Sequence, residues 1–163
     1  MKKNFWTATA LMWAVSFGVC AENAVQTDTL KSVELEEVSV VASRATAKTP
    51  IAFTNVTSDE LAKKNFGQDL PYLLSMTPSV ITTSDAGAGV GYTSLRVRGT
   101  DGSRVNITAN GVPVNDSESH NVYWVNMPDL ASSVKDVQIQ RGAGTSTNGA
   151  GAFGASINLL TSS

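Results

Sequence analysis

The chain has 163 residues and a mass of 17.1 kDa, and its 42% hydrophobic and 16% charged residues are typical of a globular domain. This composition argues against a disordered, collagenous or coiled-coil chain. Twelve basic and fourteen acidic residues give a formal net charge of -2, so there is no global basic field that could hold nucleic acid, and we expect one domain without a nucleic-acid partner.

The N-terminus has the pattern of an export signal. Two lysines precede an uncharged, mostly apolar run over residues 5–19, and Val19 and Ala21 suit a signal peptidase, so we expect a signal peptide over residues 1–21. A membrane anchor is less favoured because the run is shorter than the roughly 20 residues that a spanning helix needs. A lipid anchor on Cys20 is also less favoured. Cys20 is the one cysteine, so the mature chain would have neither disulfides nor thiolate chemistry.

A polar, acidic segment follows over residues 22–48, and we interpret it as a tether. It contains one strand-like island, Val38–Ala42. The island is either the first strand of the domain or a peptide that the sheet edge of another protein binds by strand addition. Composition alone slightly favours the first of these.

Two short helices are predicted next. A capping box that starts at Thr57 predicts a helix over residues 58–64. Asp69 and Pro71 start a second helix that ends before Pro78, and its leucines form one apolar stripe. These leucines are expected in the core.

The rest of the chain is mostly β-like. Alternating apolar and polar residues predict strands near residues 80–82, 95–98, 105–109, 136–141 and 156–160. Asn110-Gly111 predicts a tight hairpin with a short return strand at 112–114, and a short helix is expected at 128–131. Because strands and helices do not alternate regularly, the sequence predicts an α+β fold, a small mixed β-sheet with short flanking helices.

No pattern of catalytic or metal-binding residues is found. The glycines of residues 149–154 match a dinucleotide-binding fingerprint, but a loop precedes them and a β-like stretch follows, so the match is accidental. His120 is the only histidine, and no serine lies in a nucleophile elbow. We therefore expect no enzyme activity, no cofactor and no resident metal.

Four motifs resemble, in order and spacing, the plug domain of TonB-dependent outer-membrane receptors. They are Leu95–Gly99, Asn110–Val114, Val137–Gly142 and Ala155–Leu159. The resemblance covers residues 33–161 and implies a plug over residues 49–163, behind a periplasmic tether at 22–48. It also implies a place inside a 22-stranded barrel that imports an iron-siderophore complex, haem, cobalamin or a similar scarce solute. Some residues depart from those usual in the family at their positions, namely Ala109, Asn110, Gln140 and Ala143.

The resemblance implies three sets of site residues. A TonB-box-like peptide, which would pair as a strand with the C-terminal domain of TonB, consists of Glu37, Val38, Ser39, Val40, Val41, Ala42 and Ser43. Arg98 and Arg141 match arginines that meet barrel glutamates in a latch. The apex loops 85–92 and 115–124 would contact a small-molecule ligand such as a metal chelate, through Asp85, Tyr92, His120, Tyr123 and Trp124. The alternative is that these loop aromatics cover the edge of the core, and for His120 a solvated position without a ligand role is preferred.

The resemblance implies an outer-membrane location. The barrel is missing from these 163 residues, so the chain is expected to be a truncated product, a pseudogene-like fragment or a free-standing plug, which would be periplasmic. The main alternative is a soluble periplasmic binding module without transport activity. A small eight-stranded outer-membrane barrel conflicts with the capped helices, and an exported enzyme is the least favoured alternative.

Overall fold

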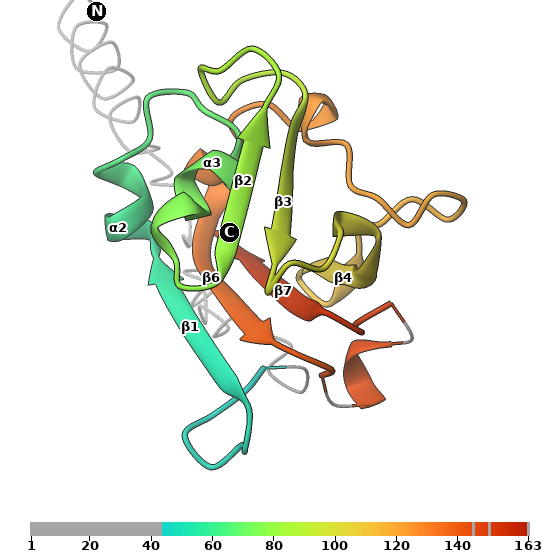
Figure 1. Cartoon of the computed structure of the whole chain (residues 1–163). Coiled ribbons are helices and arrows are strands. Elements are labelled where there is room, and N and C mark those ends of the chain that lie inside the picture. The colour runs from blue at the N-terminus through green and yellow to red at the C-terminus, as the bar shows by residue number, and fades with distance from the viewer. Residues whose placement is uncertain (1–43, 145, 150, 163) are drawn as a thin grey trace, which may run out of the picture. The chain divides into compact units, whose positions relative to one another are not determined.

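The computed structural model describes residues 44–144, 146–149 and 151–162 (Figure 1). The predicted signal peptide and the TonB-box-like peptide at 37–43 lie outside the described residues. Those that are described form a five-stranded mixed sheet, a two-stranded sheet and several short helices. The predicted α+β class with a small mixed sheet is therefore confirmed.

The elements alternate between short helices and strands without a regular repeat. In chain order they are β1 (Ala52–Thr57), α2 (Ser58–Ala62), α3 (Leu70–Leu73), η1 (Leu74–Met76), β2 (Val80–Ser84), β3 (Thr93–Val97), η2 (Gly102–Arg104), β4 (Val105–Ala109), β5 (Val112–Pro113), η3 (Trp124–Asn126), α4 (Leu130–Ser133), β6 (Val134–Arg141), η4 (Ser146–Asn148) and β7 (Ala155–Thr161). None of the helices in the described part of the chain is long and apolar enough to cross a membrane.

The helices differ from the sequence prediction at their ends. In the predicted capping box the backbone N–H of Thr57 donates to Glu60 Oε2 at 3.1 Å, but α2 already ends at Ala62. Helix α4 begins two residues later than expected, because Asp129 has a left-handed backbone conformation with φ of 53° that interrupts a start at Pro128. The ends of the predicted strands differ from the observed ones by at most two residues, which is the usual uncertainty of such boundaries, but β1 was not predicted.

The five-stranded sheet has the order β1-β6-β7-β4-β5. Strand β6 pairs antiparallel with β1 on one side and with β7 on the other. Strand β7 pairs parallel with β4, and this pair makes the sheet mixed. Figure 1 shows the β2–β3 hairpin in front of this sheet, with β6 and β7 behind it. The C-terminal strands thus occupy the middle of the sheet.

The two faces of this sheet differ in chemistry. Alternate residues of the central strands contribute one apolar face, which packs in the hydrophobic core with the leucines of α2, α3 and η1; its members are Val105, Ile107, Val137, Ile139, Ala155, Ile157 and Leu159. The opposite face consists of buried amide and hydroxyl side chains, namely Asn106, Thr108, Gln138, Gln140, Ser156 and Asn158. Hydrogen bonds such as Thr108 Oγ1 to Asn158 Oδ1 at 2.7 Å compensate for part of this burial, whereas Ser156 Oγ has no hydrogen-bond partner among the described residues.

The β2–β3 loop is fastened to α3. The backbone N–H of Asp69 donates to the carbonyl oxygen of Gly89 at 2.8 Å, and the carboxylate of Asp69 accepts from Thr93 Oγ1 at 2.9 Å. Asp69 stands at the N-cap of α3 as predicted, yet its side chain bonds β3 rather than the helix. Gly89 has φ of +78°, and a Cβ there would lie 2.5 Å from Cγ of Tyr72. The close approach of loop and ring therefore requires glycine.

We predict that Gly89→Ala lowers the free energy of unfolding by about 2–4 kcal/mol. The added Cβ is disfavoured by the left-handed backbone conformation, and it would also overpack against the Tyr72 ring. Gly87→Ala is the matched control: Gly87 has φ of +75°, and nothing lies within 4 Å of a Cβ built there. It should cost only about 1–2 kcal/mol. Urea unfolding followed by circular dichroism measures both, and equal losses would contradict the packing argument.

Candidate functional site

The structure brings the two predicted latch arginines together at one end of the sheet. Arg98 follows β3, and Arg141 ends β6. A Cβ built on Gly142 would lie 3.2 Å from Nη1 of Arg98, so the guanidinium of Arg98 reaches the glycine that follows Arg141. Two motifs about forty residues apart in sequence thus meet here, and we call Arg98 and Arg141 the basic pair.

The two arginines are held differently. Arg98 has φ of 52°, its N–H donates to the carbonyl oxygen of Ser79 at 2.9 Å, and its side chain is exposed. Arg141 is half-buried, and its Nη1 donates to Thr54 Oγ1 at 2.8 Å and to the carbonyl oxygen of Pro78 at 3.3 Å. Within the described part of the chain neither arginine forms an ion pair with a carboxylate. Because Arg98 is exposed, its charge stays hydrated and carries no desolvation cost. The partial burial of the Arg141 charge is offset by hydrogen bonds to uncharged oxygen atoms.

The apex loop between β5 and η3 is rigidly fastened by one asparagine. The side chain of Asn115 accepts from the backbone N–H of Ile107 at 2.7 Å and donates to the carbonyl oxygens of Val105 at 2.9 Å and His120 at 2.8 Å. Asn115 therefore pairs with main-chain groups of β4 that the short strand β5 does not reach. It also joins the far end of the loop to the same strand edge.

Asp116 organises the tip of this loop. Its Oδ2 accepts from the N–H and from the hydroxyl of Ser119, both at 2.8 Å. The hydrogen bond from the backbone N–H of Ser119 is the largest effect that lowers the pKa of the Asp116 carboxyl below its ordinary value. The bond from the Ser119 hydroxyl is the second largest. His120, with φ of 56°, contributes a smaller effect in the same direction. The tip is thus preorganised by charge-assisted hydrogen bonds.

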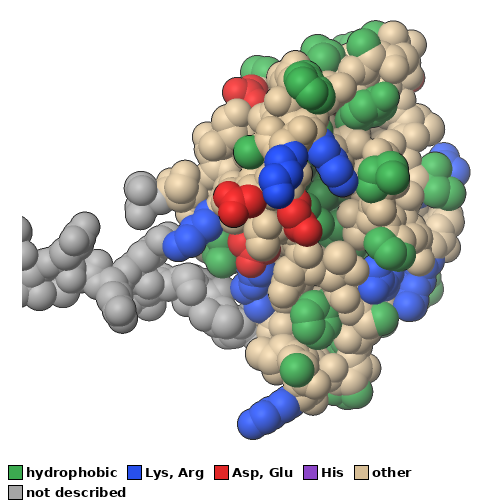
Figure 2. Space-filling model, turned by 90° about the vertical axis from the view of Figure 1, so that its left-hand side faces the viewer, with side chains coloured by type: hydrophobic (Ala, Val, Ile, Leu, Met, Phe, Trp, Pro, Cys, Tyr) green, Lys and Arg blue, Asp and Glu red, His purple; other side chains and the backbone are tan. Residues whose placement is uncertain are grey.

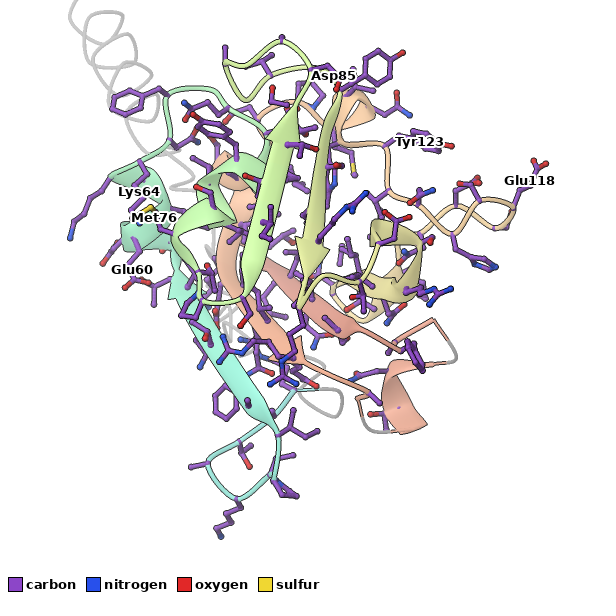
Figure 3. The ribbon with its side chains drawn as sticks, viewed as in Figure 1. Glu60, Lys64, Met76, Asp85, Glu118 and Tyr123 are labelled. Carbon is purple, nitrogen blue, oxygen red and sulfur yellow. The ribbon has the colours of Figure 1, made fainter. Side chains whose placement is uncertain are left out.

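Most of the predicted ligand-facing side chains are accessible. Asp85 and His120 are exposed, Tyr92 is 70% exposed, and Tyr123 is 49% exposed. Figure 3 shows Asp85 where the β2–β3 loop begins, and Tyr123 and Glu118 on the neighbouring loop. Glu118, at the tip, was not among the predicted residues. No group of three or more metal-ligating side chains is found among the residues that the structure describes.

The prediction that Trp124 faces a ligand is wrong. Its side chain is only 3% exposed and belongs to the hydrophobic core, so it cannot present a ring to a ligand in this structure. The large apolar indole is buried where η3 turns back toward the sheet, next to the exposed Tyr123. Of the two interpretations of the loop aromatics, packing at the core applies to Trp124.

A shallow groove of about 330 Å³ lies between β1, α2 and η1, on a side that sequence analysis did not single out. Glu60, Lys64 and Met76 line it, and Figure 3 shows their side chains on neighbouring elements. Figure 2 shows this side of the molecule with basic and acidic side chains next to one another between scattered apolar ones. The mixed charge gives the groove no single-sign field that would select a charged ligand.

Sequence analysis also missed where the tether joins the fold. Arg44 forms an ion pair with Asp136, and both main-chain groups of Ala45 bond the side chain of Gln138. Two residues of the segment assigned to the tether therefore already pack on β6. No local pattern could have signalled this, because the partners are more than ninety residues apart.

Comparisons with known proteins agree with this architecture. The family model described as TonB-dependent Receptor Plug Domain matches residues 45–156. The siderophore receptor PirA from Acinetobacter baumannii aligns at 20% identity with a TM-score of 0.51, covering 68% of this chain and 17% of that one. The ferric yersiniabactin uptake receptor FyuA from Yersinia pestis aligns at 20% identity with a TM-score of 0.53, covering 74% of this chain and 18% of that one.

A third solved structure, a variant of the ferric enterobactin receptor PfeA from Pseudomonas aeruginosa, aligns at 22% identity with a TM-score of 0.54, covering 71% of this chain and 18% of that one. No curated protein sequence matches significantly. The chain thus spans less than a fifth of the length of these receptors, and at such identities the likeness shows the fold alone. Since the family model covers most of the chain and the mixed sheet agrees with it, the chain belongs to the family of TonB-dependent receptor plug domains.

Proposed function

We propose that this domain is the gate of a TonB-dependent outer-membrane receptor for energy-coupled uptake of a scarce solute. The observation that carries the proposal is the match of the plug family model to residues 45–156. The solved receptors of similar fold are named for siderophores, which favours an iron-siderophore complex over haem or cobalamin as the solute. In this proposal the domain binds and gates, and it catalyses no reaction.

The basic pair suits attachment to a surrounding barrel. Arg98 is exposed and forms no ion pair with a described carboxylate, and Arg141 lies beside it at the end of β6. Each guanidinium group can bind a carboxylate in bidentate geometry. We propose that acidic side chains of the barrel wall are the partners of this pair.

The exposed apex side chains suit contact with an incoming ligand. Tyr92 and Tyr123 offer aromatic faces, while Asp85 and His120 offer hydrogen bonds. We leave Trp124 out of the proposed ligand surface because it is buried in the core. Hydrogen bonds of Asn115 and Asp116 hold the loop at 115–124 in shape. Contact with a ligand therefore does not require the loss of conformational entropy that ordering a flexible loop would involve.

The size and location of the native polypeptide test the proposal most directly. An antibody raised against this domain is used to blot fractionated source cells. We expect a species several times larger than 17.1 kDa in the outer-membrane fraction. A species of 17.1 kDa or less confined to the periplasm would instead support the alternative, a soluble binding module without transport activity.

We predict that Val40→Pro weakens binding of the full chain to a C-terminal fragment of TonB by at least about tenfold, because proline removes a main-chain donor from a peptide that pairs as a strand. Val33→Pro, in the same segment but outside the peptide, is the matched control and should leave the affinity unchanged. Calorimetric titration measures both. Equal affinity of Val40→Pro and the unaltered chain would refute the assignment of residues 37–43.

We predict that the apex loop loses order in acid. Because the pKa of Asp116 is lowered in the folded loop, its hydrogen bonds are at full strength above the ordinary aspartate pKa of about 3.9 and are lost as the pH falls through the lowered value. Ser119→Ala removes one donor and should raise this pKa, whereas Ser117→Ala, an exposed serine of the same loop, should not. Carboxyl carbon NMR titration distinguishes the two, and an unchanged pKa in Ser119→Ala would contradict the assignment.

A further inference from the structure

We propose that Arg44 and Ala45, with Asp136 and Gln138 of β6, form a releasable clip that fastens the root of the tether to the plug and opens before the sheet does when the tether is pulled. We call these four residues the tether clip. Its functional meaning rests on the proposed function, in which a partner binds residues 37–43 directly before Arg44. The clip itself is a property of this chain and can be tested without any partner.

The contacts of the tether clip are polar and few. The N–H of Ala45 donates to Gln138 Oε1 at 2.6 Å, and Gln138 Nε2 donates back to the carbonyl oxygen of Ala45 at 2.9 Å. One glutamine side chain thus satisfies both main-chain groups of a single residue, as a neighbouring strand would. Arg44 forms an ion pair with Asp136, two positions before Gln138 on the same face of β6.

Gln138 keeps partners when Ala45 leaves. Its Oε1 also accepts from Gln140 Nε2 at 2.9 Å, and its Nε2 also donates to Asn55 Oδ1 at 2.8 Å. A buried amide that lost its partners would oppose release, because an unsatisfied polar group is costly. Here the remaining bonds to two neighbouring side chains satisfy both the oxygen and the nitrogen of the amide. Opening the clip therefore leaves neither atom without a partner.

The ion pair is also poised to open. In the closed state Nη1 of Arg44 and Oδ1 of Asp136 are buried, and neither has a hydrogen-bond partner among the described residues. The side chain of Arg44 is 9% exposed, and that of Asp136 is 29% exposed. Release would give water to both unsatisfied atoms, which offsets part of the attraction that is lost. The clip is therefore closed by contacts that water can replace.

The next element along the chain is held much more firmly. Strand β1 pairs with β6 over its whole length, from Ala52 opposite Arg141 to Thr57 opposite Asp136. Between the clip and β1 the hydrogen bonds are those of a local turn, such as Thr49 N to the carbonyl oxygen of Thr46 at 2.8 Å. Among the residues that the structure describes, a pull from the N-terminal side therefore loads the clip first, and β1 resists only after the chain up to Ile51 is free.

Opening the clip lengthens the tether by a defined amount. The segment from Arg44 to Ile51 comes free while β1 stays paired. At about 3.4 Å per residue, an extended chain of these residues spans at most about 27 Å. A partner bound to residues 37–43 thus gains reach without unfolding the sheet, and the clip determines when that reach becomes available.

An arginine-specific protease provides the first test on the full chain. In the closed clip Arg44 is nearly inaccessible, so the rate at which the fragment beginning at Ala45 appears reports opening. Asp136→Asn, which keeps the shape of the side chain and removes its charge, should raise this rate about tenfold. The matched control is Asp101→Asn, which removes the exposed ion pair between Arg96 and Asp101 elsewhere in the fold and should not change it.

Gln138→Leu tests the other half of the clip and should raise the same rate. Hydrogen exchange of the β7 amides, measured alongside, shows whether the sheet remains intact in each variant. If Gln138→Leu fails to fold, the result of Asp136→Asn decides alone. Cleavage after Arg44 that is no faster in Asp136→Asn than in the unaltered chain would overturn the proposal.

Single-molecule pulling tests the order of events. The full chain, with Cys20→Ser so that only two thiols remain, is held through Ser39→Cys in the tether and Ser162→Cys at the end of the domain. We expect a first step of at most about 27 Å, followed at higher force by unfolding of the sheet. One rupture that releases the whole domain would overturn the proposal. Neither experiment contains TonB or a ligand, so failure here leaves the proposed function standing, and failure of TonB binding leaves the clip standing.

Discussion

The antiparallel pairing of β6 with β7 is the interaction on which the rest of the plug depends. Strand β1 reaches the sheet only through β6, and β4 reaches it only through β7. The register that sets Val137 opposite Leu159 and Ile139 opposite Ile157 also decides which side chains enter the core. A slip of one residue would place buried amides against the leucines of the helices.

The polar face of the same strands explains how distant parts of the molecule are joined. Gln140 donates to Gln138 and accepts from Asn148 Nδ2 at 2.9 Å, so a row of amides runs from the root of the tether to the loop after Arg141. An ionised glutamate at residue 140, the residue usual in the family, could not donate to Gln138. The departure from the family pattern therefore matches the bonding of this face, where Gln138 and Gln140 each serve as donor and acceptor at once.

The sequence predicted what depends on near neighbours. Alternation located β4 at its observed bounds, Asn110-Gly111 located the hairpin, and the capping residues located α2 and α3. It failed where a partner lies far along the chain: Asp69 bonds Thr93 rather than its own helix, and Ala45 bonds Gln138. Trp124 was misjudged because a loop aromatic has the same local pattern whether it faces solvent or the core. The TonB-box-like peptide stays a prediction.

The parallel pairing of β4 with β7 has a consequence for how the domain is made. Val105 has no strand partner on that side until Ala155 is available, and β1 likewise waits for β6. Contacts of such large sequence separation form late and slowly, because long loops must close first. A nascent chain that has not yet reached β7 thus lacks the strand that joins the β1–β6 pair to the β4–β5 pair, and any cut before residue 155 leaves both faces of β4 without that neighbour.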